Sequence, residues 1–456
     1  MKYFSADHIY AKGELLENHA MLVDESGTIA AIGPGETLGG DTTDTVDEMY
    51  VYPGCVLLPG CINSHVHSFQ VYLRGRSESS LHFQDWVTSH LYPLILSLDA
   101  TSLHSAALLA YHEMILSGTT TVGEFHYVHH VPGCERGSGA HQMIQAAETL
   151  GLRIVLLRAL YDRGTHPAQS RFHESPSEAL QRLEDLHAQY ADHPLVSIRP
   201  APHSLHGASG EMIEGAADFS RRHKVPMHIH LAEQESDIEY AHKHYGCGPL
   251  TALQKLGGLH EHTVLVHGCW LDQSERELLA EMGGGLAYNP LTNMALGDGV
   301  TEIPDLIQRG VPISLGTDAN IRLSIYDEAR AVEYIQRLTQ KKMGILSPES
   351  QEGHRLLDMA TIQGGRNLGI PCGSLEVGQQ ADMVVLDTSD PSLQPGALEA
   401  GEALLSQIIF SMVPQTAIQH AFVGGQQILR HRSPTLFSRQ ELHQLILSTH
   451  PRYNSH

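Results

Sequence analysis

The chain has 456 residues, of which 41% are hydrophobic and 18% charged, and its formal net charge is −23. This excess of acid argues against nucleic acid or an anionic membrane surface as the main partner, because both attract clustered lysine and arginine. The length suits one large domain with a smaller one, and no apolar run is long enough to predict a membrane span.

The N-terminal segment and the cysteines predict a cytoplasmic protein. The first residues, MKYFSADHIYAKGELLENH, lack the apolar core of a signal peptide. The six cysteines are spread singly without a Cys-x-x-Cys pair, which is typical of reduced thiols.

The two ends of the chain share a β-rich pattern. Residues 1–58 contain short strand-like runs, with Asp24 to Gly27 expected as a hairpin turn. Similar runs, such as ADMVVLDTSDP, occur in residues 371–456. We expect the two ends to meet in one small β-sandwich domain.

The middle of the chain alternates between short apolar runs and helical patterns. One helix is expected over residues 99–118, with Asp99 as its N-cap and Gly118 as its stop. Eight alternations predict an α/β fold, a parallel (β/α)8 or TIM barrel over residues 59–370. A doubly wound open sheet is the alternative. The expected strands are 61–67, 119–127, 153–162, 195–204, 225–233, 263–268, 284–290 and 312–318.

Histidine is abundant, with 32 in the chain, so a His-x-His pair has little meaning by itself. About two such pairs are expected by chance, and counting the matches finds more. The four pairs are His65/His67, His228/His230, His242/His244 and His260/His262. The third pair lies in a helical stretch and the fourth before a strand, which leaves the first two at strand ends.

Strand ends carry most of the chemically interesting residues. In a (β/α)8 barrel, these positions line one shared pocket. His65 and His67 lie two apart on a strand and therefore share a face. Histidines with carboxylates suit zinc or another divalent first-row metal. The residues at the strand ends are His65, His67, Glu124, Tyr127, His203, His228, His230, Glu233, His267 and Asp318.

Several other catalytic signatures are absent from the sequence. It contains no His-Glu-x-x-His, Gly-x-Ser-x-Gly, phosphate loop or Gly-x-Gly-x-x-Gly. The cysteine-based zinc signature of nucleobase deaminases is also missing. Serine hydrolases, kinases and dinucleotide enzymes are therefore disfavoured.

Five ordered motifs resemble the amidohydrolase superfamily in its cytosine-deaminase-like (ATZ/TRZ) branch. They are PGCINSHVH, HIHLAEQ, LVHG, LGTDA and GSLEVGQQADMVVLD. The resemblance implies the barrel, the β-sandwich and a divalent metal, Zn²⁺ first and Fe²⁺ second, held by His65, His67, His230 and Asp318. The fourth expected strand has no lysine to bridge two ions, which favours one metal.

The same resemblance implies catalytic roles. The pattern His-x-x-Glu makes His230 a ligand and Glu233 the acid/base, while His228 is structural. His267 contacts the water or the developing charge, and Asp318 also takes the proton of the water.

A closer resemblance is to the formimidoylglutamate deiminases (N-formimino-L-glutamate iminohydrolases), carried by VGEFHYVHH, HSL, LGDG and LSIYDEARAVEYIQRL. It implies a hydrolytic deaminase that releases ammonia from an amidine or formimino C–N bond. Gln70, Tyr127 and His203 match positions that line the substrate site. A small-molecule substrate follows, and a homodimer stays open as the oligomeric state.

The sequence departs from that family where a substrate carboxylate is bound. The arginine expected three residues after His203 is His206, and histidine does not replace a bidentate arginine at equal strength. Arg322, or else Arg74 or Arg76, is the candidate that could supply the charge from another direction, and the alternative reading of each is a solvated surface residue.

Three alternatives to a formimino substrate remain open. The segment YNPLTN resembles aminohydrolases of ring substrates such as purines, pterins or triazines, which is the alternative to a formimino substrate. Another hydrolysis on the same scaffold is a second alternative, and a non-catalytic barrel homologue is a third. The roles of His126, His129, His130 and His206 also stay open.

Overall fold

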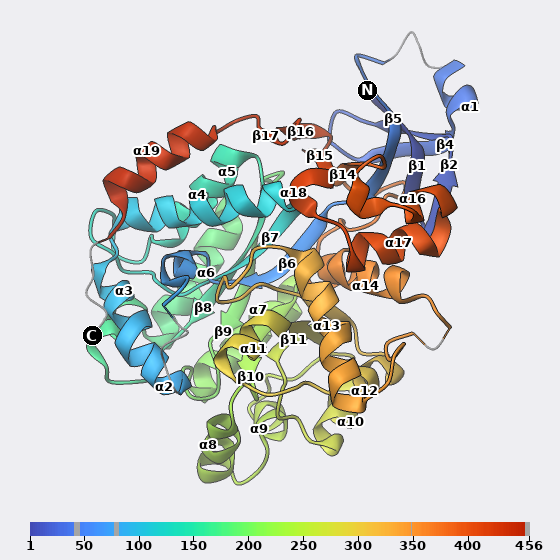
Figure 1. Ribbon diagram of the computed structural model, residues 1–456. Helices are drawn as coiled ribbons and strands as arrows, with labels where there is room; N and C mark the ends of the chain where they lie inside the picture. The colour runs from blue at the N-terminus through green and yellow to red at the C-terminus, as the bar shows by residue number, and fades with distance from the viewer. Residues whose placement is uncertain (41–45, 77–81, 348, 452–456) are drawn as a thin grey trace.

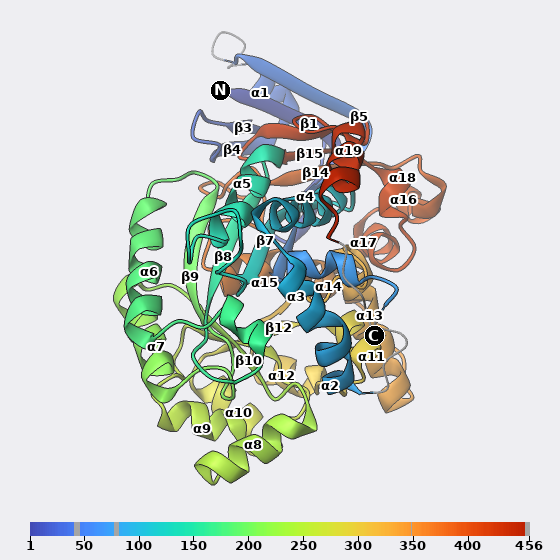
Figure 2. The same cartoon turned by 90° about the vertical axis from the view of Figure 1, so that its left-hand side faces the viewer.

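The structure, a computed structural model, describes residues 1–40, 46–76, 82–347 and 349–451. Its strands form three sheets (Figure 1): one of nine strands from both ends of the chain, and two of four strands from the middle. Helices surround the two central sheets, and the nine-stranded sheet lies to one side of them (Figure 2).

The nine-stranded sheet joins the two ends of the chain, because β5 pairs antiparallel with β14. Eight of its strands pair in one continuous order and β2 pairs with β1 beside that order, consistent with the small β domain predicted from both ends. The predicted hairpin turn joins β3 to β4, with Gly27 at φ +79°. The strands are β1 (Lys2–Ala11), β2 (Glu14–Glu17), β3 (His19–Val23), β4 (Ile29–Pro34), β5 (Glu48–Pro59), β14 (Met383–Asp387), β15 (Ile418–Val423), β16 (Gln426–Arg430) and β17 (Ser433–Pro434).

All eight strands predicted in the middle of the chain are present. They pair in parallel and in sequence order, unlike a doubly wound sheet, whose strand order reverses at a switch point. The first sheet contains β6 (Cys61–Val66), β7 (Thr119–His126), β8 (Arg153–Leu160) and β9 (Val196–Pro202). The second contains β10 (Met227–Leu231), β11 (Thr263–His267), β12 (Gly285–Tyr288) and β13 (Ile313–Leu315).

The two central sheets meet through single backbone contacts. Val66 forms an isolated parallel bridge with Asp318, and the His230 amide donates to the His203 carbonyl at 3.1 Å. We expected one closed barrel sheet, whereas the described strands pair as two four-stranded sheets. Closure into a continuous barrel therefore stays a prediction.

Long helices follow most of the central strands. The N-cap of α4 is Asp99, as predicted: its carboxylate accepts from the Ser102 amide at 2.8 Å, and Gly118 follows the helix at φ +91°. The helices are α4 (Ala100–Leu116), α5 (Ala140–Leu150), α6 (Pro176–Gln189), α7 (Gly210–His223), α8 (Glu235–Tyr245), α9 (Pro249–Lys255), α10 (Gln273–Glu281), α11 (Pro290–Leu296), α12 (Ile303–Gln308), α13 (Ile325–Gln340), α14 (Glu352–Ala360) and α15 (Ile362–Leu368).

Shorter elements cover the carboxyl ends of the central strands. They are η1 (Ser68–Leu73), α2 (Phe83–Trp86), the π-helical turn η3 (Val87–Leu91), α3 (Tyr92–Ser97) and η4 (Pro167–Arg171). The remaining helices are α1 (Gly35–Gly40), α16 (Gly396–Glu399), α17 (Gly401–Phe410), α18 (Pro414–Ala417) and α19 (Arg439–Thr449), the last of which lies along α4 (Figure 1).

No single helix in the described part of the chain has both the length and the apolar composition needed to cross a membrane. One bent pair, Phe83–Ser97 with Ala100–Leu116, meets the requirement in length and composition alone.

Candidate metal centre and catalytic site

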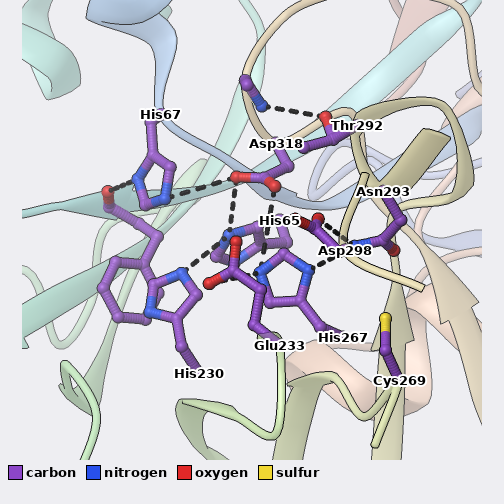
Figure 3. Close-up of polar contacts among 12 residues, drawn as sticks. His65, His67, His230, Glu233, His267, Cys269, Thr292, Asn293, Asp298 and Asp318 are labelled. Carbon is purple, nitrogen blue, oxygen red and sulfur yellow. Dashed lines mark hydrogen bonds and ion pairs between the residues drawn. The ribbon is translucent and has the colours of Figure 1, made fainter. Parts of the chain in front are cut away.

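The four predicted metal ligands lie together at the carboxyl ends of β6, β10 and β13 (Figure 3). His65 Nε2 lies 3.2 Å from His230 Nε2 and 3.5 Å from Asp318 Oδ1. His67 Nε2 lies 3.4 Å from the same carboxylate oxygen. Three imidazole nitrogens and one carboxylate oxygen therefore face a common point.

The other nitrogens of two of these rings are occupied by backbone carbonyl groups. His67 Nδ1 lies 2.8 Å from the Phe125 carbonyl oxygen, and His230 Nδ1 lies 2.9 Å from that of His203. A ring that donates through Nδ1 keeps its Nε2 lone pair for a metal, as metal-binding histidines do. This arrangement fits one divalent ion held by three nitrogens and one oxygen.

Burial keeps the histidines neutral. It lowers the pKa of His65 to about 3, and it also lowers the pKa values of His67 and His230. Burial alone would raise the pKa of Asp318, but its hydrogen bond with His65 and its attraction to His267 outweigh that effect and lower it. Neutral imidazoles and a charged carboxylate are the forms that bind metal ions.

Backbone hydrogen bonds hold Asp318 against the first strand. Its amide donates to the His65 carbonyl at 3.0 Å, and its own carbonyl accepts from the His67 amide at 3.1 Å. Asp318 has φ +41° and His267 has φ +74°. Such backbone conformations in non-glycine residues cost about 1–3 kcal/mol, and they cluster where a side chain must be aimed.

Glu233 and His267 face the predicted metal ligands. His267 Nε2 lies 3.7 Å from Glu233 Oε2 and 3.9 Å from Asp318 Oδ2. Burial, together with the nearby carboxylates of Asp298 and Asp318, raises the pKa of Glu233 well above its ordinary value, which favours a protonated carboxyl group. Glu233 is thus placed to give a proton beside the candidate metal centre.

Asp298 is a buried carboxylate that the sequence reasoning missed. It accepts hydrogen bonds from the side-chain amides of Gln234 and Asn293, the latter at 2.7 Å. Burial raises its pKa to about 8. It lies within the LGDG motif, which the family resemblance included without a role, and one of its two donors, Gln234, is 64 positions away in the chain.

A cavity of about 420 Å³ opens above the metal ligands. Its floor includes His67, His230, Glu233, His267 and Asp318. None of the described residues that line it is lysine or arginine. The aromatic side chains of its wall are Phe83, Trp86, Tyr92, Tyr127, Tyr161, Phe172 and Tyr240.

Three of the four predicted substrate-binding residues line this cavity: Gln70, Tyr127 and His203. Gln70 Nε2 donates to Tyr127 Oη at 3.2 Å. Arg322 does not line the cavity: its side chain is 60% exposed and its Nε lies 2.8 Å from Asp327 Oδ2. The structure thus gives Arg322 no contact with the site, although Asp318 is only four residues away in the chain.

His206, at the position of the expected arginine, lines the cavity with a side chain that is 46% exposed. Its Nδ1 lies 3.3 Å from Asp237 Oδ1. Arg74 is engaged elsewhere, with Glu113 at 2.7 Å and the Asn320 carbonyl at 2.9 Å. The guanidinium groups of Arg74 and Arg322 are therefore both engaged outside the cavity, and His206 carries none.

The remaining strand-end residues lie outside the cavity. Glu124 is buried and accepts hydrogen bonds from Tyr111 at 3.0 Å and from Ser68. His228 Nε2 lies 2.8 Å from the Asn367 carbonyl, in keeping with the structural role predicted for it. The buried residues outside the cavity also include His126, His129 and His130.

Comparison with known proteins gives concordant matches. The profile described as "Amidohydrolase family" matches residues 56–428. A 5-methylthioadenosine/S-adenosylhomocysteine deaminase from Syntrophobacter fumaroxidans is 32% identical over 89% of this chain and 87% of its own. A 5'-deoxyadenosine deaminase from Methanothermobacter thermautotrophicus is 30% identical over 84% and 83%. The crystal structure of an adenosine deaminase from Xanthomonas campestris with bound zinc superimposes with a TM-score of 0.86, at 25% identity and covering 98% and 97% of the two chains.

Proposed function

The chain belongs to the amidohydrolase family and is a hydrolase acting on C–N bonds, and we propose that it deaminates an uncharged ring amine of the purine-nucleoside kind. The observation that carries this proposal is an aromatic cavity with no lysine or arginine among its described lining residues, directly above a three-histidine, one-carboxylate cluster. The names of the similar deaminases support the same substrate class.

We propose that His65, His67, His230 and Asp318 hold one divalent ion, Zn²⁺ first and Fe²⁺ second. When bound, such an ion lowers the pKa of water from about 16 towards about 7. The similar adenosine deaminase structure with bound zinc supports this assignment.

The protein groups around the ion handle the protons. Water adds to the ring carbon that bears the amino group, and Asp318 Oδ2 accepts one of its protons. Glu233 gives its proton to the adjacent ring nitrogen, and His267 Nε2 donates a hydrogen bond to the adding oxygen. The amino group leaves as ammonia with the proton from Asp318, while Glu233 regains a proton from the added hydroxyl as the carbonyl forms.

A formimino-L-glutamate substrate, which the closer resemblance implied, fits less well. Its carboxylates would enter a cavity with no arginine or lysine among the described lining residues. A carboxylate left without a cationic partner in a desolvated site pays a penalty that its contacts do not offset. A planar neutral ring, by contrast, stacks on the aromatic wall. A non-catalytic barrel homologue is disfavoured because every ligand and acid/base position is filled.

Ammonia release by the zinc-loaded protein tests the proposal. We expect turnover of adenosine, 5'-deoxyadenosine and 5'-methylthioadenosine, weaker turnover of S-adenosylhomocysteine because it carries a charged amino acid group, and none of formimino-L-glutamate. Turnover of formimino-L-glutamate and of none of the ring amines would contradict the proposal and support the formimino substrate that the closer resemblance implied. Pterin and triazine amines in the same panel separate purine from other ring substrates.

For the scaffold, we propose that residues 59–370 act as a (β/α)8 barrel domain, with residues 1–58 and 371–456 in the β-sandwich. The single contacts of Val66 with Asp318 and of His203 with His230 support this closure. An experimental structure with the metal bound tests whether these contacts extend into ladders.

A further inference from the structure

The segment after β12 folds back on itself beside the catalytic histidine. Helix α11 ends at Leu296, and Gly297, at φ +72°, reverses the chain so that the Asp298 amide donates to the Asn293 carbonyl at 3.0 Å. Trp270 Nε1 donates to the Asp298 carbonyl at 2.6 Å and fixes the turn from outside. The side chains of Asn293 and Asp298 are thereby held next to each other, although they are five positions apart in the chain.

Asn293 uses both hydrogens of its side-chain amide. Its Nδ2 lies 3.0 Å from His267 Nδ1 and 2.7 Å from Asp298 Oδ2 (Figure 3). In the opposite amide orientation, both hydrogens of the Asn293 side chain would lie where its oxygen now lies, a buried place with no hydrogen-bond partner among the described residues. The other oxygen of Asp298 accepts from Gln234, so its carboxylate has a donor on each side.

This orientation determines where His267 carries its proton. Because Nδ1 accepts from Asn293, the proton of the neutral ring is on Nε2. Nε2 faces Glu233 Oε2 at 3.7 Å and Asp318 Oδ2 at 3.9 Å. A lone pair at that nitrogen would point at two carboxyl groups, whereas an N–H group suits that position.

We propose that Asn293 and Asp298 are positioning residues that fix His267 as its Nε2–H tautomer, so that it donates a hydrogen bond towards the reacting oxygen. The inference deepens the proposed function and rests on it for the role of that hydrogen bond. It also gives a role to the motifs YNPLTN and LGDG, which the metal cluster and Glu233 leave without one.

The same contacts argue against a second cation at this place. Ligand atoms of Glu233, His267 and Asp298 lie within 4.8 Å of one another, which is close enough for a shared ion. However, the His267 lone pair and both Asp298 oxygens already accept hydrogen bonds from amides. The cluster is therefore better described as a chain of hydrogen bonds that runs from Gln234 through Asp298 and Asn293 to His267.

The test measures the tautomer directly. In zinc-loaded protein labelled with ¹⁵N-histidine, the His267 signals are assigned as those missing from H267Q. We expect the wild type to show a protonated Nε2 and an unprotonated Nδ1. N293D places a hydrogen-bond acceptor beside His267 Nδ1 instead of a donor, so we expect Nδ1 to be protonated. We expect kcat to fall at least about 10²-fold and KM to stay within about threefold of the wild-type value.

Two further variants keep the test decisive if N293D does not fold. N293A and D298A each remove the constraint without reversing it, and we expect a mixture of the two tautomers with a smaller loss of kcat. M294L changes an exposed neighbour on the same helix and serves as the control.

An unchanged Nε2–H tautomer in N293D, or in N293A and D298A together, would overturn the proposal, and so would a changed tautomer with unchanged kcat. The NMR result does not depend on the substrate. If the wild type deaminates none of the ring amines, the proposed function fails while the tautomer assignment stands or falls separately.

Discussion

The floor and the wall of the cavity are built in different ways. The floor consists of side chains at the ends of parallel strands, where backbone hydrogen bonds such as that from the Asp318 amide to His65 fix each position. The wall comes from the short elements α2, η3, α3 and η4, from residues that directly follow β7, β8 and η4, and from α8, which contribute mainly aromatic and aliphatic side chains. We therefore expect the floor to determine the reaction and the wall to determine which molecule reaches it. Substitutions in the floor should therefore mainly lower kcat, and substitutions in the wall should mainly raise KM.

The largest effect is expected from removing a metal ligand in the floor. H65A leaves two histidines and Asp318, and we expect loss of bound zinc and a fall in kcat of about 10⁴-fold or more, because water then lacks its activating ion. Metal analysis and ammonia release measure both quantities. H242A is the matched control, since it removes an exposed member of another His-x-His pair and should retain the metal.

A substitution of Glu233 tests the proton transfer in the floor without removing a metal ligand. E233Q should retain zinc and lose about 10²- to 10⁴-fold in kcat, because the amide cannot give the proton that the ring nitrogen needs. E235Q, an exposed carboxylate two residues further on, is the control. Normal turnover by E233Q would remove Glu233 from the mechanism.

Substitutions of aromatic residues in the wall should raise KM. Trp86 lines the cavity, and loss of aromatic contact with a planar ring costs about 0.5–1.5 kcal/mol, so W86A should raise KM about 2- to 12-fold. We expect its zinc content to be unchanged and its kcat to change less than its KM. Y334A, on the exposed face of α13, is the control. A fall in kcat alone would mean that the wall also orients the reacting group.

The smallest effect is expected where the chain departs from the formimidoylglutamate deiminases. H206R supplies the guanidinium that those enzymes use, but at a half-exposed position already paired with Asp237. Exposed ion pairs contribute about 0–1 kcal/mol, so we expect S-adenosylhomocysteine to gain at most about fivefold in kcat/KM relative to 5'-methylthioadenosine. H206Q, which adds no charge, should leave that ratio unchanged.

The sequence predicted the floor better than the wall. The eight strands were readable because apolar runs and their spacing are local signals, and strand ends meet wherever such strands pair in parallel. Apart from Tyr127, the aromatic wall was not predicted, because residues from Phe83 to Tyr240 follow no common period and meet only after folding. Sheet closure depends on single contacts, such as that of Val66 with Asp318, which leave no pattern.

Two site residues show the same limit. Arg322 was expected in the site because Asp318 is near in sequence, yet its side chain turns to Asp327 at the start of α13. The hydrogen bond between Asn293 and His267 joins residues 26 positions apart, and no spacing rule links a helix residue to the end of a preceding strand. Sequence neighbourhood thus predicts which strand end a residue follows, but not where its side chain points.

The distance along the chain between the ligands also has a consequence for synthesis. About 250 residues separate His67 from Asp318. At about 5–20 residues per second, roughly 10–50 seconds pass on the ribosome between the appearance of the first two ligands and the last. In the ligand set that we propose, His65 and His67 alone form an incomplete site, so we expect stable capture of the ion to wait until the last central strand has been made. The ion would then be acquired late, by a chain whose central strands are already available to pair.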